Sequence, residues 1–199
     1  MTRKPFPLPM MTLNPDVIAR RIQRNPWIRE VSVGREFPDR LVILVRERKA
    51  VALLQQEQGL QLVDSEGTPF KRMETGDEPN LPILTGFVRE GRTDEALVKK
   101  SLVLLNYLEG TKDIPSIGGI SEVHGNENFG LSLFTDVGLC LKLGFDGYEN
   151  KLKRLTPVME DLDRKNLKRG FLLIALSDPE KINVQQRTIL GPVGPTGNR

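Results

Sequence analysis

Residues 28–47 carry the pattern that most narrows the folds open to this chain. Apolar side chains alternate with polar neighbours in two short runs, Val31 and Val33, then Leu41, Ile43 and Val45. Successive side chains of a strand point to opposite faces, so two such runs around the Pro-Asp turn at 37–39 predict a β-hairpin with one buried face. The charged positions in and after these runs, among them Arg35, Arg46 and Arg48, then fall outside the sheet or at its rim.

The segments on either side of this hairpin also have recognisable boundaries. Asn14 can cap a short helix with Pro15 in its first turn, and Pro26 ends that helix near Asn25 because proline disfavours helical backbone in the preceding residue. We expect Trp27, at the corner between helix and strand, to bury its ring. Two further hairpins are predicted over residues 51–64 and 62–72.

The pattern changes at residues 81–86, where a Leu-Pro step leads into a Gly- and Arg-containing connection. A helix follows that Thr93 can cap and Gly110 can end. Three alternating runs within residues 118–145 predict an antiparallel meander, a second helix is expected over residues 148–162, and two strands close the fold. The chain is therefore expected to be α+β.

We divide the chain into four parts on these patterns. Residues 1–11 are a Pro-rich arm, expected to be flexible, and residues 12–86 form a module of one helix and a three-stranded antiparallel sheet. Residues 93–186 form a second antiparallel sheet domain with two helices, and residues 187–199 are expected to be a disordered tail.

Composition removes several classes of function. The 29 basic and 26 acidic residues leave a net charge of only +3, which gives no basic stripe for nucleic acid. Cys140 is the only cysteine and is expected at an apolar strand position, and His124, the only histidine, is expected at a strand end or in a loop. No phosphate-binding loop, metal-ligand spacing or nucleophile motif accompanies them. We therefore expect no enzyme activity, no cofactor and no metal.

Several motifs occur together in one order along the chain. These are Pro26-Trp27-Ile28, Arg35 to Pro38, Glu47-Arg48 with Val51-Ala52, and Leu62-Val63-Asp64 with Gly67. The order resembles the periplasmic region of the bacterial cell-division family FtsQ/DivIB. Residues 131–155 and 171–185 resemble later parts of the same family, so the likeness covers about residues 12–186.

The resemblance implies a fold, a location and partners. It implies that the first module is a POTRA domain and the second a β-rich domain, and that the protein lies at the inner membrane on its periplasmic side. A membrane helix and the first POTRA strand and helix would then precede Met1. The function implied is that of a non-catalytic divisome scaffold that binds FtsB- and FtsL-like proteins and helps to regulate septal peptidoglycan synthesis.

The expected binding surface is the last strand, because only the tail follows it and no later element can cover its edge. Family resemblance indicates the same place, where a partner strand would add to the sheet. We expect Ile182 and Val184 to face the core and Lys181, Asn183 and Gln185 to face outwards, with a turn shaping the approach. That turn comprises Ser177, Asp178, Pro179 and Glu180.

Secondary and alternative functions stay open at this level. Arg35, Arg46 and Arg48 are candidates for contact with an acidic partner or with membrane headgroups, although charged edge strands also serve to prevent aggregation. The alternatives to a division scaffold are a POTRA-containing chaperone of envelope assembly and, in another class, a periplasmic hydrolase that would use His124 or a carboxylate pair.

Overall fold

The computed structural model describes residues 13–77, 79–167, 171–178 and 180–187 of the 199-residue chain. The chain divides into two compact units, Met1–Ala50 and Val51–Arg199. The predicted arm at 1–11, Pro179 and nearly all of the predicted tail lie outside the described residues.

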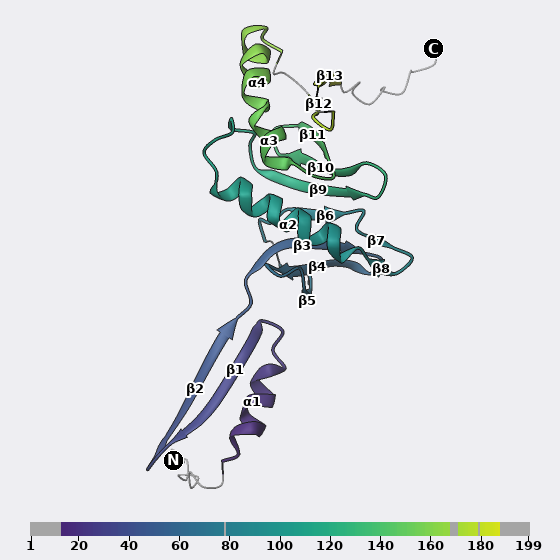
Figure 1. Cartoon of the computed structure of the whole chain (residues 1–199). Helices are drawn as coiled ribbons and strands as arrows, with labels where there is room; N and C mark the ends of the chain where they lie inside the picture. The colour runs from purple at the N-terminus through teal and green to yellow at the C-terminus, as the bar shows by residue number, and fades with distance from the viewer. Residues whose placement is uncertain (1–12, 78, 168–170, 179, 188–199) are drawn as a thin grey trace, which may run out of the picture. The chain divides into compact units, whose positions relative to one another are not determined.

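In its described part, from residue 13 on, the first unit is a helix and a two-stranded sheet (Figure 1). Helix α1 (Pro15–Gln23) begins as expected, since the Asn14 side chain accepts a hydrogen bond of 3.0 Å from the backbone N–H of Asp16. Strands β1 (Ile28–Glu36) and β2 (Arg40–Glu47) pair antiparallel, with Val33 opposite Ile43 and Val31 opposite Val45. The predicted helix and hairpin are confirmed.

Burial in this first unit is shallow. No described residue before Ala50 is buried, and the β2 side chains Leu44 and Val45 are 66% and 46% exposed. The prediction that Trp27 buries its ring is wrong, since its side chain is 38% exposed. One nine-residue helix and two strands do not provide enough surface to enclose an indole ring at their corner.

The second unit is built on one mixed sheet of nine strands among the described residues. Its order is β13-β12-β11-β10-β9-β6-β3-β4-β5, and β7 with β8 forms a separate small ribbon. The strands are β3 (Ala50–Gln56), β4 (Gly59–Asp64), β5 (Pro69–Arg72), β6 (Ile83–Thr85), β7 (Val88–Arg89), β8 (Arg92–Thr93), β9 (Ile120–Asn126), β10 (Gly130–Thr135), β11 (Leu139–Gly144), β12 (Phe171–Ala175) and β13 (Asn183–Arg187). Strands β9, β10 and β11 pair antiparallel, which confirms the predicted meander.

Three helices pack on one face of this sheet and enclose the core. They are α2 (Glu95–Gly110), α3 (Tyr148–Lys153) and α4 (Leu155–Arg164). Alternate residues of the strands, such as Leu133, Leu141 and Ile174, form a single buried cluster with side chains from all three helices. In the described part of the chain, no helix has both the length and the apolar character that a membrane span requires.

The fold class is confirmed as α+β, but two details differ from the expectation. Strands β3 to β6, assigned to the first module, belong to the nine-stranded sheet, so the units separate near Ala50 and the first keeps two strands. The reason is that β6 pairs in parallel with both β3 and β9 and so joins the segments before and after residue 86.

The second difference concerns the helix expected over residues 148–162. It divides at Arg154 into α3 and α4. Pro157, in the first turn of α4, carries no backbone N–H, and in an unbroken helix its ring would collide with the carbonyl of Lys153. Helix α2 is capped by Asp94 in place of Thr93, with its side chain 2.9 Å from the N–H of Leu97.

Candidate functional site

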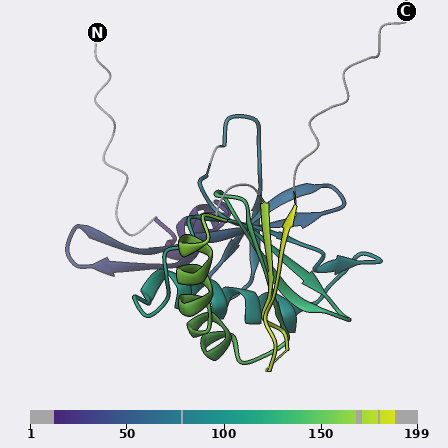
Figure 2. The same ribbon diagram turned by 90° about the horizontal axis from the view of Figure 1, so that it is seen from above.

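Among the residues that the structure describes, strand β13 lies at one end of the nine-stranded sheet, with β12 as its single neighbour. Figure 2 shows these two strands side by side, and their register pairs Ala175 with Asn183 and Leu173 with Gln185. A strand at the end of a sheet presents a row of main-chain N–H and C=O groups that can pair with another chain.

The hydrogen bonds of β12 identify which β13 groups face that free edge. Leu172 and Leu176 donate their N–H groups to carbonyls of the β11 side, Gly138 and Lys142, at 3.1 and 2.8 Å. Alternate residues of a strand direct their main-chain groups to the same side, so the odd-numbered residues Leu173 and Ala175 face β13. Their partners Gln185 and Asn183 are therefore used within the sheet, and Val184 between them directs its N–H and C=O groups outwards.

The turn before β13 is held by two side chains. The Asp178 carboxylate accepts hydrogen bonds from the N–H groups of Glu180 and Lys181, at 2.8 and 3.1 Å. From the junction of α3 and α4, Arg154 donates to the main-chain carbonyl of Asp178 at 2.9 Å. Ser177, Asp178, Glu180 and Lys181 are exposed, and Ile182 is half-buried against the core. These hydrogen bonds fix the conformation of the turn that leads into β13.

A hollow of about 510 Å³ runs beside this edge, between β13 and helix α4. Ile182, Val184 and Gln186 line it from the strand, and Val158 and Leu162 line it from the helix. Val184 is 39% exposed, and it lies on the helix-covered face of the sheet because its partner Ile174 is buried there. The site therefore combines a free main-chain edge with a largely apolar groove.

An ion pair forms part of the helical wall of this groove. Lys165 Nζ lies 2.6 Å from Asp161 Oδ2, and Arg164 lies 3.7 Å from the same carboxylate. The hydrogen bond from Lys165 lowers the pKa of Asp161 from its ordinary value, with a further contribution from the neighbouring charges. Asp161 therefore presents an ionised carboxylate to anything bound in the groove at neutral pH.

The candidate arginines of the first unit do not form one cluster. Arg46 Nη1 lies 3.1 Å from Glu30 Oε2, and Arg35 donates a hydrogen bond to the carbonyl of Leu13. Arg35 stands opposite Leu41 in the hairpin, whereas Arg46 stands opposite Glu30 on the other face and about 17 Å further along the strands. Arg48 follows β2 and donates its backbone N–H to Trp27.

His124 lies in a small polar cluster on the face of the sheet opposite the helices. Thr85 Oγ1 lies 2.5 Å from Glu122 Oε1 and 2.8 Å from His124 Nδ1, and these three residues come from the paired strands β6 and β9. Cys140 is half-buried in β11, between Leu139 and Leu141. In the described residues, no group of three or more His, Cys, Asp and Glu side chains could hold a metal.

The α4 wall of the groove was not predicted. Val158 and Asp161 lie in the segment predicted as a helix and Lys165 lies just after it, but no feature of the sequence singled them out as binding residues. Leu155, Met159 and Leu162 form the buried stripe of α4. Val158 lies beside this buried stripe on the surface of α4. An apolar residue next to the core-facing stripe could therefore have indicated a second contact surface on the helix.

Comparison with known proteins assigns both units to described families. Residues 52–178 match the family "Cell division protein FtsQ/DivIB, C-terminal", and residues 2–48 match "POTRA domain, FtsQ-type". The matched ranges meet near residue 50, where the two compact units also separate.

Curated relatives and one solved structure bear the same names. The FtsQ proteins of Syntrophotalea carbinolica and Anaeromyxobacter sp. strain K are 34% and 36% identical, over 87% and 77% of this chain. The chain spans 60% and 53% of their lengths. An extracytoplasmic domain of DivIB from Geobacillus stearothermophilus is 18% identical, with a TM-score of 0.38, covering 60% of this chain and 97% of that one. On the family matches, this chain belongs to the FtsQ/DivIB family of cell-division proteins.

Proposed function

We propose that this chain is a non-catalytic scaffold of the cell-division machinery and that it captures a partner by strand addition at β13. The observation that carries the proposal is the outward-facing main chain of Val184 at the end of the sheet. In strand addition, main-chain hydrogen bonds supply affinity, and pockets for alternate side chains supply selectivity.

The groove beside β13 supplies such a pocket. A strand added antiparallel or parallel to β13 directs every second side chain to the helix-covered face, where Ile182, Val184 and Val158 offer apolar contact. The partner segment is therefore extended, with apolar residues at alternate positions. A basic residue at its end would meet the ionised carboxylate of Asp161.

The proposed partners are FtsB- and FtsL-like division proteins, because this chain belongs to the FtsQ/DivIB family. The proposed location is the periplasmic side of the inner membrane, and the proposed role is to link these partners and to help regulate septal peptidoglycan synthesis. The eight predicted site residues in the described turn and strand are Ser177, Asp178, Glu180, Lys181, Ile182, Asn183, Val184 and Gln185. Val184 is the central one.

A proline at position 184 tests the proposal directly. Val184→Pro removes an N–H that faces outwards and leaves the Asn183 and Gln185 bonds to β12 in place. We expect its affinity for an FtsB-like peptide, measured by calorimetry with the full chain, to fall about tenfold or more.

The matched control is Val184→Ala, which shortens the same side chain but keeps the main-chain donor. It should lose less affinity than the proline variant, and both should retain the far-ultraviolet circular dichroism of the parent. Asn183→Pro should in addition loosen β13 itself, because that donor is used by β12. Equal binding by Val184→Pro and the parent would refute strand addition at this edge.

A further inference from the structure

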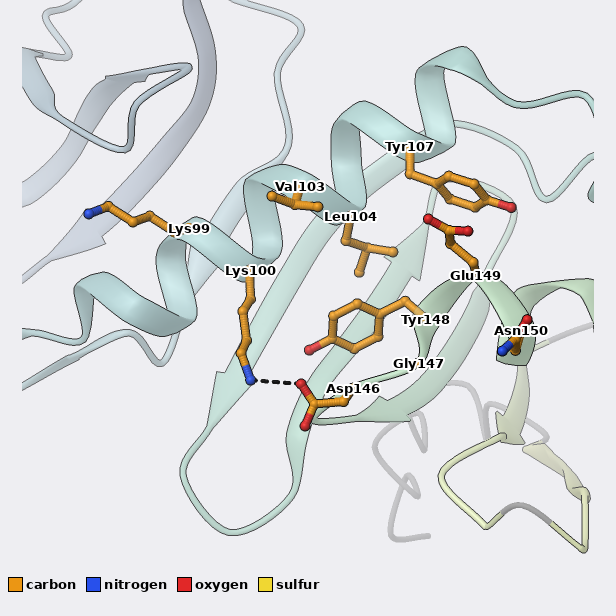
Figure 3. A pocket seen from close by; sticks show the side chains of 10 residues that line it. All are labelled: Lys99, Lys100, Val103, Leu104, Tyr107, Asp146, Gly147, Tyr148, Glu149 and Asn150. Carbon is orange, nitrogen blue, oxygen red and sulfur yellow. Dashed lines mark hydrogen bonds and ion pairs between the residues drawn. The ribbon is translucent and has the colours of Figure 1, made fainter.

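A second hollow, of about 480 Å³, lies between helices α2 and α3 and is remote in sequence from β13 (Figure 3). Leu104 forms part of its floor and is 1% exposed, and the rings of Tyr107 and Tyr148 form its walls. A tyrosine is already uncharged at neutral pH, and burial, with the nearby Asp146 carboxylate, raises the pKa of Tyr148 further, to about 12. The hollow is therefore an apolar groove along one side of α2.

Val103 forms an exposed apolar ridge at the edge of this groove. Its side chain is 68% exposed, although it lies mid-helix on α2. It also lines a hollow of about 660 Å³ on the other side of α2, together with Leu102 and Leu105. An apolar ridge between two hollows provides both the projection and the recess that packing of one helix against another requires.

The charges at the two ends of the groove are opposite and unpaired. Lys100 is neutralised by Asp146, with 2.8 Å between Nζ and Oδ1. Among the described residues, by contrast, the side chains of Lys99 and Glu149 make no ion pair or hydrogen bond. Figure 3 shows Lys99 at one end of the groove and Glu149 beside Tyr107 at the other.

We infer that this surface binds a second copy of the same chain, with the two α2 helices antiparallel about a two-fold axis at Val103. Lys99 precedes Val103 by one helical turn and Tyr107 follows it by one turn, so the axis places Lys99 of each copy opposite Tyr107 and Glu149 of the other. Each Val103 then enters the apolar groove of the other copy. A patch with an unpaired lysine at one end and an unpaired glutamate at the other is complementary in charge to itself.

The test is the oligomeric state of the full chain by sedimentation velocity over a wide range of concentration. We expect a reversible dimer that weakens at high salt because its two symmetric ion pairs lie at the rim. Val103→Asp should give a monomer, since it places two carboxylates near the axis. Lys99→Glu should raise the dissociation constant about tenfold, and Lys99→Glu combined with Glu149→Lys should restore most of the affinity.

Two controls separate this surface from the rest of the molecule. Val137 is 65% exposed in another part of the unit, so Val137→Asp should leave the dimer intact while making the same chemical change. Val184→Pro, at the proposed partner-binding edge, should also dimerise normally. A parent chain that is monomeric throughout, a dimer that persists in Val103→Asp, or a charge exchange that fails to restore association would each overturn the inference.

Discussion

Strands β2 and β11 both have apolar residues at alternate positions, but they differ in how well these residues are covered. In β11, Leu139, Leu141 and Leu143 are at most 4% exposed, and the intervening Lys142 is exposed. In β2, Ile43 and Val45 occupy the same kind of alternate position and are 42% and 46% exposed. Alternation thus predicts that a segment is a strand, but burial depends on a second layer that the strand itself does not encode.

The two units provide very different second layers. In the second unit, three helices cover one face of nine strands, and the buried side chains form one cluster. In the first unit, α1 half-buries Val31 and Val33 of β1, and β2 carries apolar residues on both faces across 41–45. A strand with apolar residues on both faces is typical of a sheet that is covered on both faces, but β2 is exposed along most of its length.

Hydrogen exchange should show the largest difference between the two units. Amide protection reflects the free energy of the opening that exposes each hydrogen bond, and local openings cost far less than global unfolding. We expect amides of β10 and β11 to exchange more slowly than those of β1 and β2 by a factor on the order of a thousand or more. Mass spectrometry of peptic fragments measures both sets in one experiment. Equal or greater protection of β1 and β2 would mean that the first unit is stabilised by contacts other than those described.

Truncation of matched apolar strand positions should give the next largest difference. Leu141→Ala removes a side chain with no exposed surface and should destabilise the second unit by about 2–5 kcal/mol. Ile43→Ala removes a side chain that is 42% exposed and should cost less than about 1 kcal/mol. Urea denaturation monitored by circular dichroism gives both values, and similar losses at the two sites would contradict the difference in burial.

The smallest expected effect concerns acid. Lys71 Nζ lies 2.5 Å from Asp77 Oδ2, and this hydrogen bond lowers the pKa of Asp77 and raises that of Lys71. A lowered carboxyl pKa stabilises the fold above the unfolded value of about 3.9 and is lost as pH falls through the lower folded value. Carboxyl carbon NMR should show Asp77 titrating below that value, and Lys71→Met should return it towards normal. An unchanged titration in that variant would assign the shift to another cause.

The local elements of this protein could be predicted from its residues, because their signals come from near neighbours in the chain. The Asn14 cap, the stop at Pro26, the β1–β2 hairpin and the meander of β9 to β11 all depend on spacings of a few residues. The same local reasoning failed at Pro157, where the helix divides, although the signal was present.

Strand order and the geometry of the candidate site depended on the tertiary structure. The parallel pairs of β6 with β3 and β9, which place the unit boundary at residue 50, join segments that no local pattern links. That the last strand ends the sheet was expected from its position. Which of its main-chain groups face outwards depends on the register with β12, and the groove depends on how α4 packs beside it. Local spacing therefore determined the elements, whereas pairing between distant segments decided which surfaces remain available for binding.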